Sequence, residues 1–170
     1  MGSRLKPLTN DKPKCMLKLF NETLIERQIK IFHGFNINDI TIVTGYRSEV
    51  IDIPDVNYVK NKNYETTNIN ESLFCALEPS SSPVLVTYGD IVFGQKIIQQ
   101  MLEITDGIGL AVNLNWKKYY QNRTTHPLSE AENVLVENGR ILQIRKNISK
   151  SLESQQIGEF LGIMMLSSEY

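Results

Sequence analysis

The opening stretch Gly2–Met16 reads GSRLKPLTNDKPKCM, and it decides how the rest of the chain is interpreted. Gly2 permits backbone angles that other residues resist, whereas Pro7 and Pro13 fix φ and interrupt regular structure. The stretch therefore predicts a defined loop rather than a helix or a central strand. A rigid loop that is also basic suits an anion with several oxygens, such as a nucleoside triphosphate. The charged residues of the loop are four bases and one acid: Arg4, Lys6, Lys12, Lys14 and Asp11.

Two of these bases are candidate phosphate ligands. Lys14 follows Pro13, whose fixed φ anchors the backbone of the lysine. A lysine presents a compact charge to a phosphate oxygen, and the planar fork of Arg4 matches phosphate geometry. Basic side chains at a surface are also commonly just solvated. Both interpretations stand for Arg4 and Lys14 at this point.

Beyond the loop, helical and strand patterns alternate. Apolar spacing predicts helices over residues 22–32, 70–78 and 95–104, a short helix over 48–51, and Asn21 as the first N-cap. Runs rich in β-branched residues predict strands over 39–46, 56–60, 84–90, 108–113 and 158–166. Asn138-Gly139 predicts a hairpin turn between residues 133–136 and 140–144. We expect an α/β fold of the Rossmann-like type, with a mixed, mostly parallel sheet flanked by helices and the hairpin at an antiparallel edge.

Length and composition limit the classes of protein. With 170 residues we expect a single domain over 1–170, and a net charge of −1 excludes a general nucleic-acid partner. No apolar run approaches 18 residues, which predicts no membrane partner and a cytoplasmic location. The two cysteines, Cys15 and Cys75, have apolar neighbours and are expected in the core. Two histidines are too few for a histidine-rich metal site.

The strand candidate VLVTYGD, residues 84–90, ends in Gly89-Asp90. In open α/β sheets, ligands bind beyond the carboxyl ends of the strands. An aspartate in that place is suited to hold a divalent metal such as Mg²⁺. The alternative is an aspartate that only caps a turn. A basic loop that binds a triphosphate favours the metal, because polyphosphate charge is neutralised from both sides.

Further acidic residues lie in the second half of the chain. Glu130 and Glu132 are suited to acid–base or metal chemistry, or they belong to an ordinary solvated loop. Glu159 opens the last predicted strand, where it can accept hydrogen bonds from a substrate hydroxyl or amine. The alternative for Glu159 is a polar residue that decorates a strand edge.

The opening motif resembles the signature of the nucleotidyltransferases, in which a small-residue turn is followed by Ser-Arg, Pro-Leu-Thr and Pro-Lys. The resemblance implies a nucleotide-diphospho-sugar transferase type of fold. It places Gly2, Ser3 and Arg4 on the triphosphate, Lys14 on phosphate groups and Asp90 on the metal. The stretches NYETTNINESL, HPLSEAENV and GEFLGIMML are similar to the branch that contains phosphocholine and 2-aminoethylphosphonate cytidylyltransferases.

The resemblance also implies an activity. We expect transfer of a nucleoside monophosphate, CMP from CTP, to a phosphorylated or phosphonate small molecule, with Mg²⁺ as cofactor and pyrophosphate released. Asn68 is expected to contact the nucleotide, and the acceptor is expected to contact Asn70, Ser72, Glu130, Glu132 and Glu159. Family members begin with an apolar strand and carry a second metal-binding aspartate, so we expect this chain to be shortened at both ends. A sugar-1-phosphate nucleotidyltransferase and a non-catalytic nucleotide-binding remnant are the alternatives.

Overall fold

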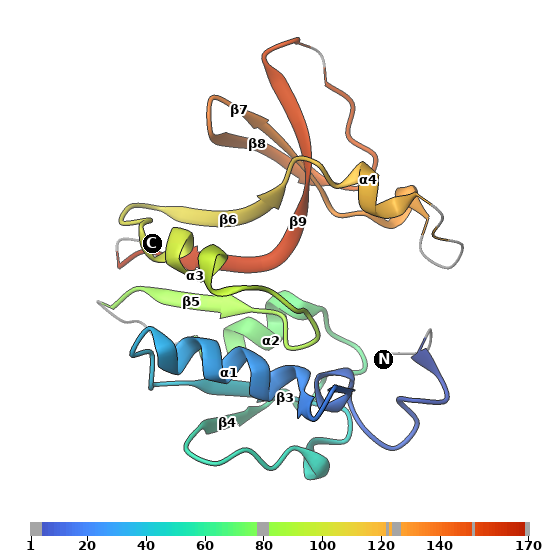
Figure 1. The fold of residues 1–170 in the computed structure, drawn as a ribbon, viewed down its shortest axis with the longest axis vertical. Helices are drawn as coiled ribbons and strands as arrows, with labels where there is room; N and C mark the ends of the chain where they lie inside the picture. The colour runs from blue at the N-terminus through green and yellow to red at the C-terminus, as the bar shows by residue number, and fades with distance from the viewer. Residues whose placement is uncertain (1–4, 78–81, 122, 124–126, 151, 169–170) are drawn as a thin grey trace. The chain divides into compact units, whose positions relative to one another are not determined.

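The structure is a computed structural model that describes residues 5–77, 82–121, 123, 127–150 and 152–168. It divides into two compact units. Unit 1 takes the chain up to Pro83 together with Tyr88–Glu103, and unit 2 takes Val84–Thr87 together with the chain from Ile104 onward. Figure 1 shows the elements of each unit in chain order by colour.

Unit 1 contains three α-helices, two 3₁₀ turns and two small ladders among its described residues. The strands β1 and β2 form an antiparallel pair, and β3 and β4 form a parallel pair in which Thr41 lies opposite Asn57. The elements are η2 (Lys14–Met16), β1 (Lys18–Leu19), β2 (Glu22–Thr23), α1 (Leu24–Gly34), β3 (Thr41–Thr44), η3 (Ser48–Val50), β4 (Asn57–Lys60), α2 (Ile69–Ala76) and α3 (Gln95–Leu102).

The first helix begins at a capping box rather than at the predicted Asn21. Thr23 is the N-cap: its hydroxyl accepts from the backbone N–H of Glu26, and the Glu26 carboxylate accepts from the backbone N–H of Thr23. The prediction was wrong because residues 22–23 pair as β2, so the helix begins two residues later than expected. Two residues of η2, Cys15 and Met16, pack against a buried cluster whose members are Ile25, Ile29, Ile42 and Ile53.

Unit 2 is built around a five-stranded sheet in which β9 is central. Its first half pairs with β7 and its second half with β5, while β6 pairs along most of its length, and Figure 1 shows β9 curving between these partners. Gly158 allows the close approach of β6, because a Cβ there would lie 2.2 Å from Val112 Cγ1. The elements are β5 (Val84–Thr87), β6 (Ile108–Asn113), α4 (Lys117–Tyr120), η4 (Leu128–Glu130), β7 (Asn133–Glu137), β8 (Arg140–Arg145) and β9 (Gln155–Leu166).

The predicted hairpin is confirmed. Asn138 and Gly139 have φ values of 51° and 76°, the positive angles of a type I′ turn, and β7 and β8 pair antiparallel on either side. The turn closes in two residues because the polar pair Asn-Gly adopts these angles at little cost.

The α/β class is confirmed, but fewer strand pairs are parallel than expected. The strands β3 and β4 are parallel, and the connection between them includes η3. In the five-stranded sheet, by contrast, every strand pair found is antiparallel. The reason is β9, which runs opposite to each of its three partners. Pattern alone does not reveal strand direction, because alternation of helices and strands leaves the pairing partner open.

One expectation about burial needs correction. Cys15 is partly buried against the core of unit 1, as predicted, but Cys75 is exposed. Its helix α2 contains no buried residue, and Phe74 beside it is 64% exposed. Within the part of the chain that the structure describes, no helix has the length and apolarity that crossing a membrane requires.

Candidate active site

Lys14 and Asp90, predicted separately from sequence, contact each other in unit 1. The Lys14 Nζ lies 3.1 Å from the Asp90 Oδ2, and both side chains remain more than one third exposed, at 39% and 35%. A cation and a carboxylate thus meet at one surface point, where each can still reach a ligand from solvent. This is the arrangement expected if Lys14 binds phosphate and Asp90 binds a metal ion.

The 3₁₀ turn η2 holds the backbone of Lys14. Pro13 precedes the turn at φ −70°, and the backbone N–H of Leu17 donates to the Lys14 carbonyl at 3.0 Å. Cys15 and Met16 face the core cluster of unit 1. The apolar neighbours anchor the turn, so the Lys14 side chain projects outward from a fixed base.

Burial of the turn also affects the thiol beside Lys14. Desolvation raises the pKa of Cys15 to about 11, and the nearby negative charge of Asp90 acts in the same direction. Cys15 is therefore a protonated packing residue at neutral pH and is unsuited to act as a nucleophile.

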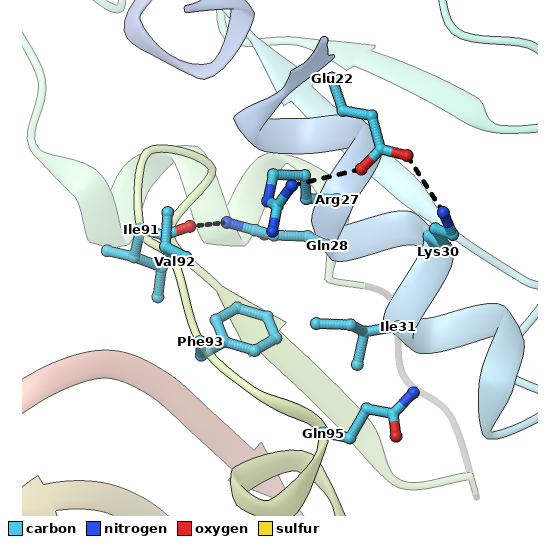
Figure 2. A pocket seen from close by; sticks show the side chains of 9 residues that line it. All are labelled: Glu22, Arg27, Gln28, Lys30, Ile31, Ile91, Val92, Phe93 and Gln95. Atoms are coloured by element: carbon cyan, nitrogen blue, oxygen red, sulfur yellow. Dashed lines mark hydrogen bonds and ion pairs between the residues drawn. The ribbon is translucent and has the colours of Figure 1, made fainter. Parts of the chain in front are cut away.

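Gln28, which was not predicted from the sequence, forms hydrogen bonds with the segment that carries Asp90. Gln28 is 1% exposed, and its Nε2 donates to the carbonyl oxygens of Tyr88 and Ile91 at 2.9 and 2.8 Å. Figure 2 shows the amide of Gln28 directed at Ile91. Beside it, α1 and residues 91–95 line a pocket of about 350 Å³. A signal was present in the sequence: Gln28 is the polar residue on an otherwise apolar face of this helix.

A hydrogen bond from Tyr46 helps to hold the remaining part of the opening loop. The hydroxyl of Tyr46 donates to the carbonyl oxygen of Asn10 at 3.0 Å, and Thr9 is buried. Gly2, Ser3 and Arg4, expected on the triphosphate, lie outside the described residues. Their roles stay predictions.

Three candidates also lie in unit 1, near the start of α2. Asn68 caps this helix, since its Oδ1 accepts from the backbone N–H groups of Asn70 and Glu71. Ser72 accepts from Nδ2 of the buried Asn61 at 2.9 Å. Asn70 has an exposed side chain. These contacts give Asn68 and Ser72 structural roles, and their predicted contacts with substrate stay predictions.

The acidic candidates Glu130, Glu132 and Glu159 belong to unit 2. The hydroxyl of Tyr120 donates to Glu159, and burial together with this bond raises the pKa of Tyr120 to about 12. The guanidinium of Arg123 lies 4.6 Å from the centre of the Tyr120 ring. Glu159 therefore lies beside a protonated phenol.

Contacts with β9 position these aromatic and acidic groups. Trp116, at the start of α4, donates from Nε1 to the Ile157 carbonyl of β9 at 3.0 Å and packs edge-on against Tyr120. Glu132 is exposed, although its carbonyl accepts from the backbone N–H of Phe160, and Glu130 is partly buried in η4.

The chemistry of the donors indicates what kind of metal ion fits Asp90. No cluster of three or more His, Cys, Asp or Glu side chains suited to a metal occurs among the residues described. Mg²⁺ in phosphate-transfer sites is bound through one or two carboxylates together with substrate phosphates. A single accessible carboxylate therefore fits a Mg²⁺ ion shared with a nucleotide, and does not form a complete metal site alone.

Comparison with known proteins identifies the family. The family model for the MobA-like NTP transferase domain matches residues 1–146. The chain belongs to the MobA-like NTP transferase family. It is a nucleotidyltransferase, as the opening motif predicted.

Relatives of this MobA-like domain include enzymes named for CTP. The CTP:phosphoglutamine cytidylyltransferase of Campylobacter jejuni is 31% identical over 94% of this chain and 68% of its own length. The choline-phosphate cytidylyltransferase of Streptococcus pneumoniae is 31% identical over 55% of this chain, and the Aquifex aeolicus bifunctional IPC transferase and DIPP synthase is 29% identical over 88%. The chain spans 42% and 34% of the length of these last two relatives.

Solved structures show the same fold. The inositol-1-phosphate CTP transferase from T. maritima has a TM-score of 0.70 at 19% identity and covers 98% of this chain and 66% of its own. The CTP:phosphocholine cytidylyltransferase from Streptococcus pneumoniae has a TM-score of 0.60 at 22% identity and covers 99% and 68%. These likenesses confirm the nucleotide-diphospho-sugar transferase type of fold.

Proposed function

We propose that this chain transfers CMP from CTP to a phosphorylated or phosphonate small molecule and releases pyrophosphate. The observation that carries the proposal is the contact between Lys14 and Asp90, at 3.1 Å and accessible from solvent. A cation that binds phosphate and a carboxylate that binds a metal ion are the two protein groups that displacement at an α-phosphorus requires most. The names of the relatives, which refer to phosphoglutamine and choline phosphate, support CTP and a phosphorylated acceptor.

In the proposed reaction, an oxygen of the acceptor's phosphate or phosphonate attacks the α-phosphorus of CTP in line. The bond from the α-phosphorus to the oxygen bridging the β-phosphorus breaks, and pyrophosphate leaves with the electron pair of that bond. Positioning and charge stabilisation supply most of the rate enhancement, because the step needs little covalent help from protein.

Each candidate residue has a place in this proposal. Lys14 binds a phosphate oxygen and Asp90 would hold Mg²⁺, which when bound neutralises the charge that the displacement concentrates on the phosphates. The triphosphate contacts Gly2, Ser3 and Arg4, and Asn68 contacts the nucleotide. Groups of the acceptor are bound by the remaining candidates: Asn70, Ser72, Glu130, Glu132 and Glu159.

The same contact also fits a sugar-1-phosphate nucleotidyltransferase. This second candidate is favoured by a relative from Sulfurisphaera tokodaii, a bifunctional sugar-1-phosphate nucleotidylyltransferase/acetyltransferase that is 24% identical over 92% of this chain. The two functions share the triphosphate site and differ in the acceptor and in the base of the nucleotide.

We also propose that the protein is located in the cytoplasm, as expected from the sequence.

A substrate panel tests these functions. The protein is incubated with Mg²⁺, one of CTP, UTP, dTTP and GTP, and one of phosphocholine, 2-aminoethylphosphonate, phosphoglutamine and glucose 1-phosphate. Pyrophosphate release and the mass of the product are measured. CTP with a non-sugar acceptor is expected to react. A preference for dTTP or UTP with the sugar phosphate would favour the second candidate, and nucleotide binding without pyrophosphate release would identify a non-catalytic remnant.

A further inference from the structure

We infer that Gln28 is a positioning residue, which sets the backbone on both sides of Asp90 and so tunes affinity for the metal–nucleotide complex. The inference rests on the proposed function, in which Asp90 holds the metal. Its basis is the pair of hydrogen bonds from Gln28 Nε2 to the carbonyl oxygens of Tyr88 and Ile91, at 2.9 and 2.8 Å.

The two acceptors bracket the aspartate. Tyr88 lies two residues before Asp90 and Ile91 lies one residue after it, so a single amide group restrains the peptide units on both sides. Gln28 is 1% exposed, so water does not readily replace its N–H groups as donors to the two carbonyl oxygens. Loss of these donors would leave two carbonyl groups without these partners, and the turn would relax to regain hydrogen bonds with solvent.

The helix that carries Gln28 also supports the partner of Asp90. Ile25, one turn before Gln28 on α1, belongs to the cluster against which Cys15 and Met16 of η2 pack. A Cβ on Gly89 would lie 3.4 Å from Cys15 Cβ and 3.8 Å from the Ile25 side chain, which places the aspartate turn in close contact with both elements. One helix thus holds Lys14 through apolar packing and Asp90 through the amide of Gln28.

A role in positioning is distinct from a role in folding alone. Metal-binding carboxylates depend on neighbouring hydrogen bonds for their orientation, and loss of such a bond weakens metal affinity by roughly 10- to 100-fold. Gln28 donates from α1 to the backbone of Ile91, the residue after Asp90, and Figure 2 shows its amide directed at that residue. We therefore expect its effect to concern the metal-dependent part of nucleotide binding.

The test uses Gln28→Met, which keeps the length of the side chain and removes both donors. Binding of Mn²⁺·CTP is followed by the electron paramagnetic resonance signal of free Mn²⁺, and binding of metal-free CTP is measured in EDTA by calorimetry. The dissociation constant for Mn²⁺·CTP is expected to rise about 10-fold or more, while that for metal-free CTP changes less than about 2-fold. Ile98→Val, a buried change on α3 outside the cluster that packs against η2, is the matched control and should leave both constants unchanged.

Further variants separate the possible failures. If Gln28→Met does not fold, Gln28→Asn, which retains an amide but is too short to reach both carbonyls, takes its place. Unchanged Mn²⁺·CTP affinity in a folded Gln28 variant, or equal losses with and without metal, would overturn the inference. Asp90→Asn is measured in parallel. If it weakens Mn²⁺·CTP binding while the Gln28 variant does not, only the positioning role fails. If Asp90→Asn has no effect either, the proposed metal role of Asp90 fails as well.

Discussion

Lys14 and Asp90, 76 residues apart in the sequence, form an ion pair across two surface segments of unit 1. In the proposed function, a metal–nucleotide complex would offer both groups new partners, because phosphate oxygens would attract the lysine and the metal would attract the carboxylate. Breaking an exposed ion pair of this kind costs little, since such pairs contribute at most about 1 kcal/mol to the free energy of unfolding.

Replacement of Lys14 tests its contact with phosphate. Lys14→Ala is expected to reduce turnover with CTP on the order of 100-fold, the scale of losing one electrostatic contact in a transition state. Lys12→Ala, a change to a neighbouring lysine that lies 3.7 Å from Asp11, is the control and should retain activity. Turnover is measured by pyrophosphate release. Equal turnover in wild type and Lys14→Ala would refute the role.

Replacement of Asp90 tests the metal. Asp90→Asn keeps the size of the side chain and removes its charge, so turnover at low Mg²⁺ is expected to fall by about 100-fold and to recover in part as Mg²⁺ is raised. Asp11→Asn, at an exposed position on the opening loop, serves as control. The measurement is the rate as a function of Mg²⁺ concentration. A wild-type Mg²⁺ dependence in Asp90→Asn would contradict the assignment.

Glu159 is expected to act on the acceptor and not on the nucleotide. Glu159→Gln preserves an oxygen that can accept from Tyr120 but removes the negative charge. For an acceptor with an ammonium group, KM should rise on the order of 10-fold, the scale of one charge-assisted hydrogen bond, while KM for CTP stays the same. Glu153→Gln, a change at an exposed glutamate of unit 2, is the control. A parallel rise in both KM values would argue for a general loss of structure.

The capping box predicts a stability change with a defined pH dependence. Thr23→Ala is expected to lower the free energy of unfolding by about 1 kcal/mol. The N–H and hydroxyl of Thr23 donate to Glu26 and hold the pKa of this carboxylate below 4.5, its ordinary value. The stabilisation by ionised Glu26 is therefore present above that value and is lost as pH falls through the lower, folded pKa.

Urea unfolding between pH 3 and pH 7 measures this effect. Glu26→Gln should show a smaller difference in stability between wild type and variant at pH 3 than at pH 7. A difference that stays constant across this range would show that the carboxylate contributes nothing through its charge.

The two cysteines are expected to differ in reactivity. Cys15 is half-buried with its pKa raised to about 11, whereas Cys75 is exposed on α2. At pH 8, iodoacetamide should modify Cys75 at least about tenfold faster, because the thiolate is the reactive form. Mass spectrometry of the digested protein measures both rates. Labelling in urea is the control, where the two rates should converge, and equal rates in the folded protein would contradict the burial of Cys15.

Local sequence determined most elements of this protein and the chemistry of its candidate site. Proline, glycine and basic residues identified the opening loop, Asn138-Gly139 identified the hairpin, and Lys14 and Asp90 were recognised one by one. These features are encoded by neighbouring residues, because turn angles and the charge of a side chain need no distant contact. Strand direction is not encoded in this way, and the antiparallel pairs around β9 differed from the parallel sheet expected.

Only the tertiary structure brought Lys14 to Asp90 and revealed why Gln28 is buried. Both relationships join segments at least 60 residues apart. A glutamine on an apolar helix face is unfavourable unless carbonyl groups from elsewhere accept its hydrogens. No periodicity along the helix tells which carbonyls these are. The sequence by itself therefore determined the kinds of groups that can bind a charged phosphate, and packing between distant segments decided which of them meet.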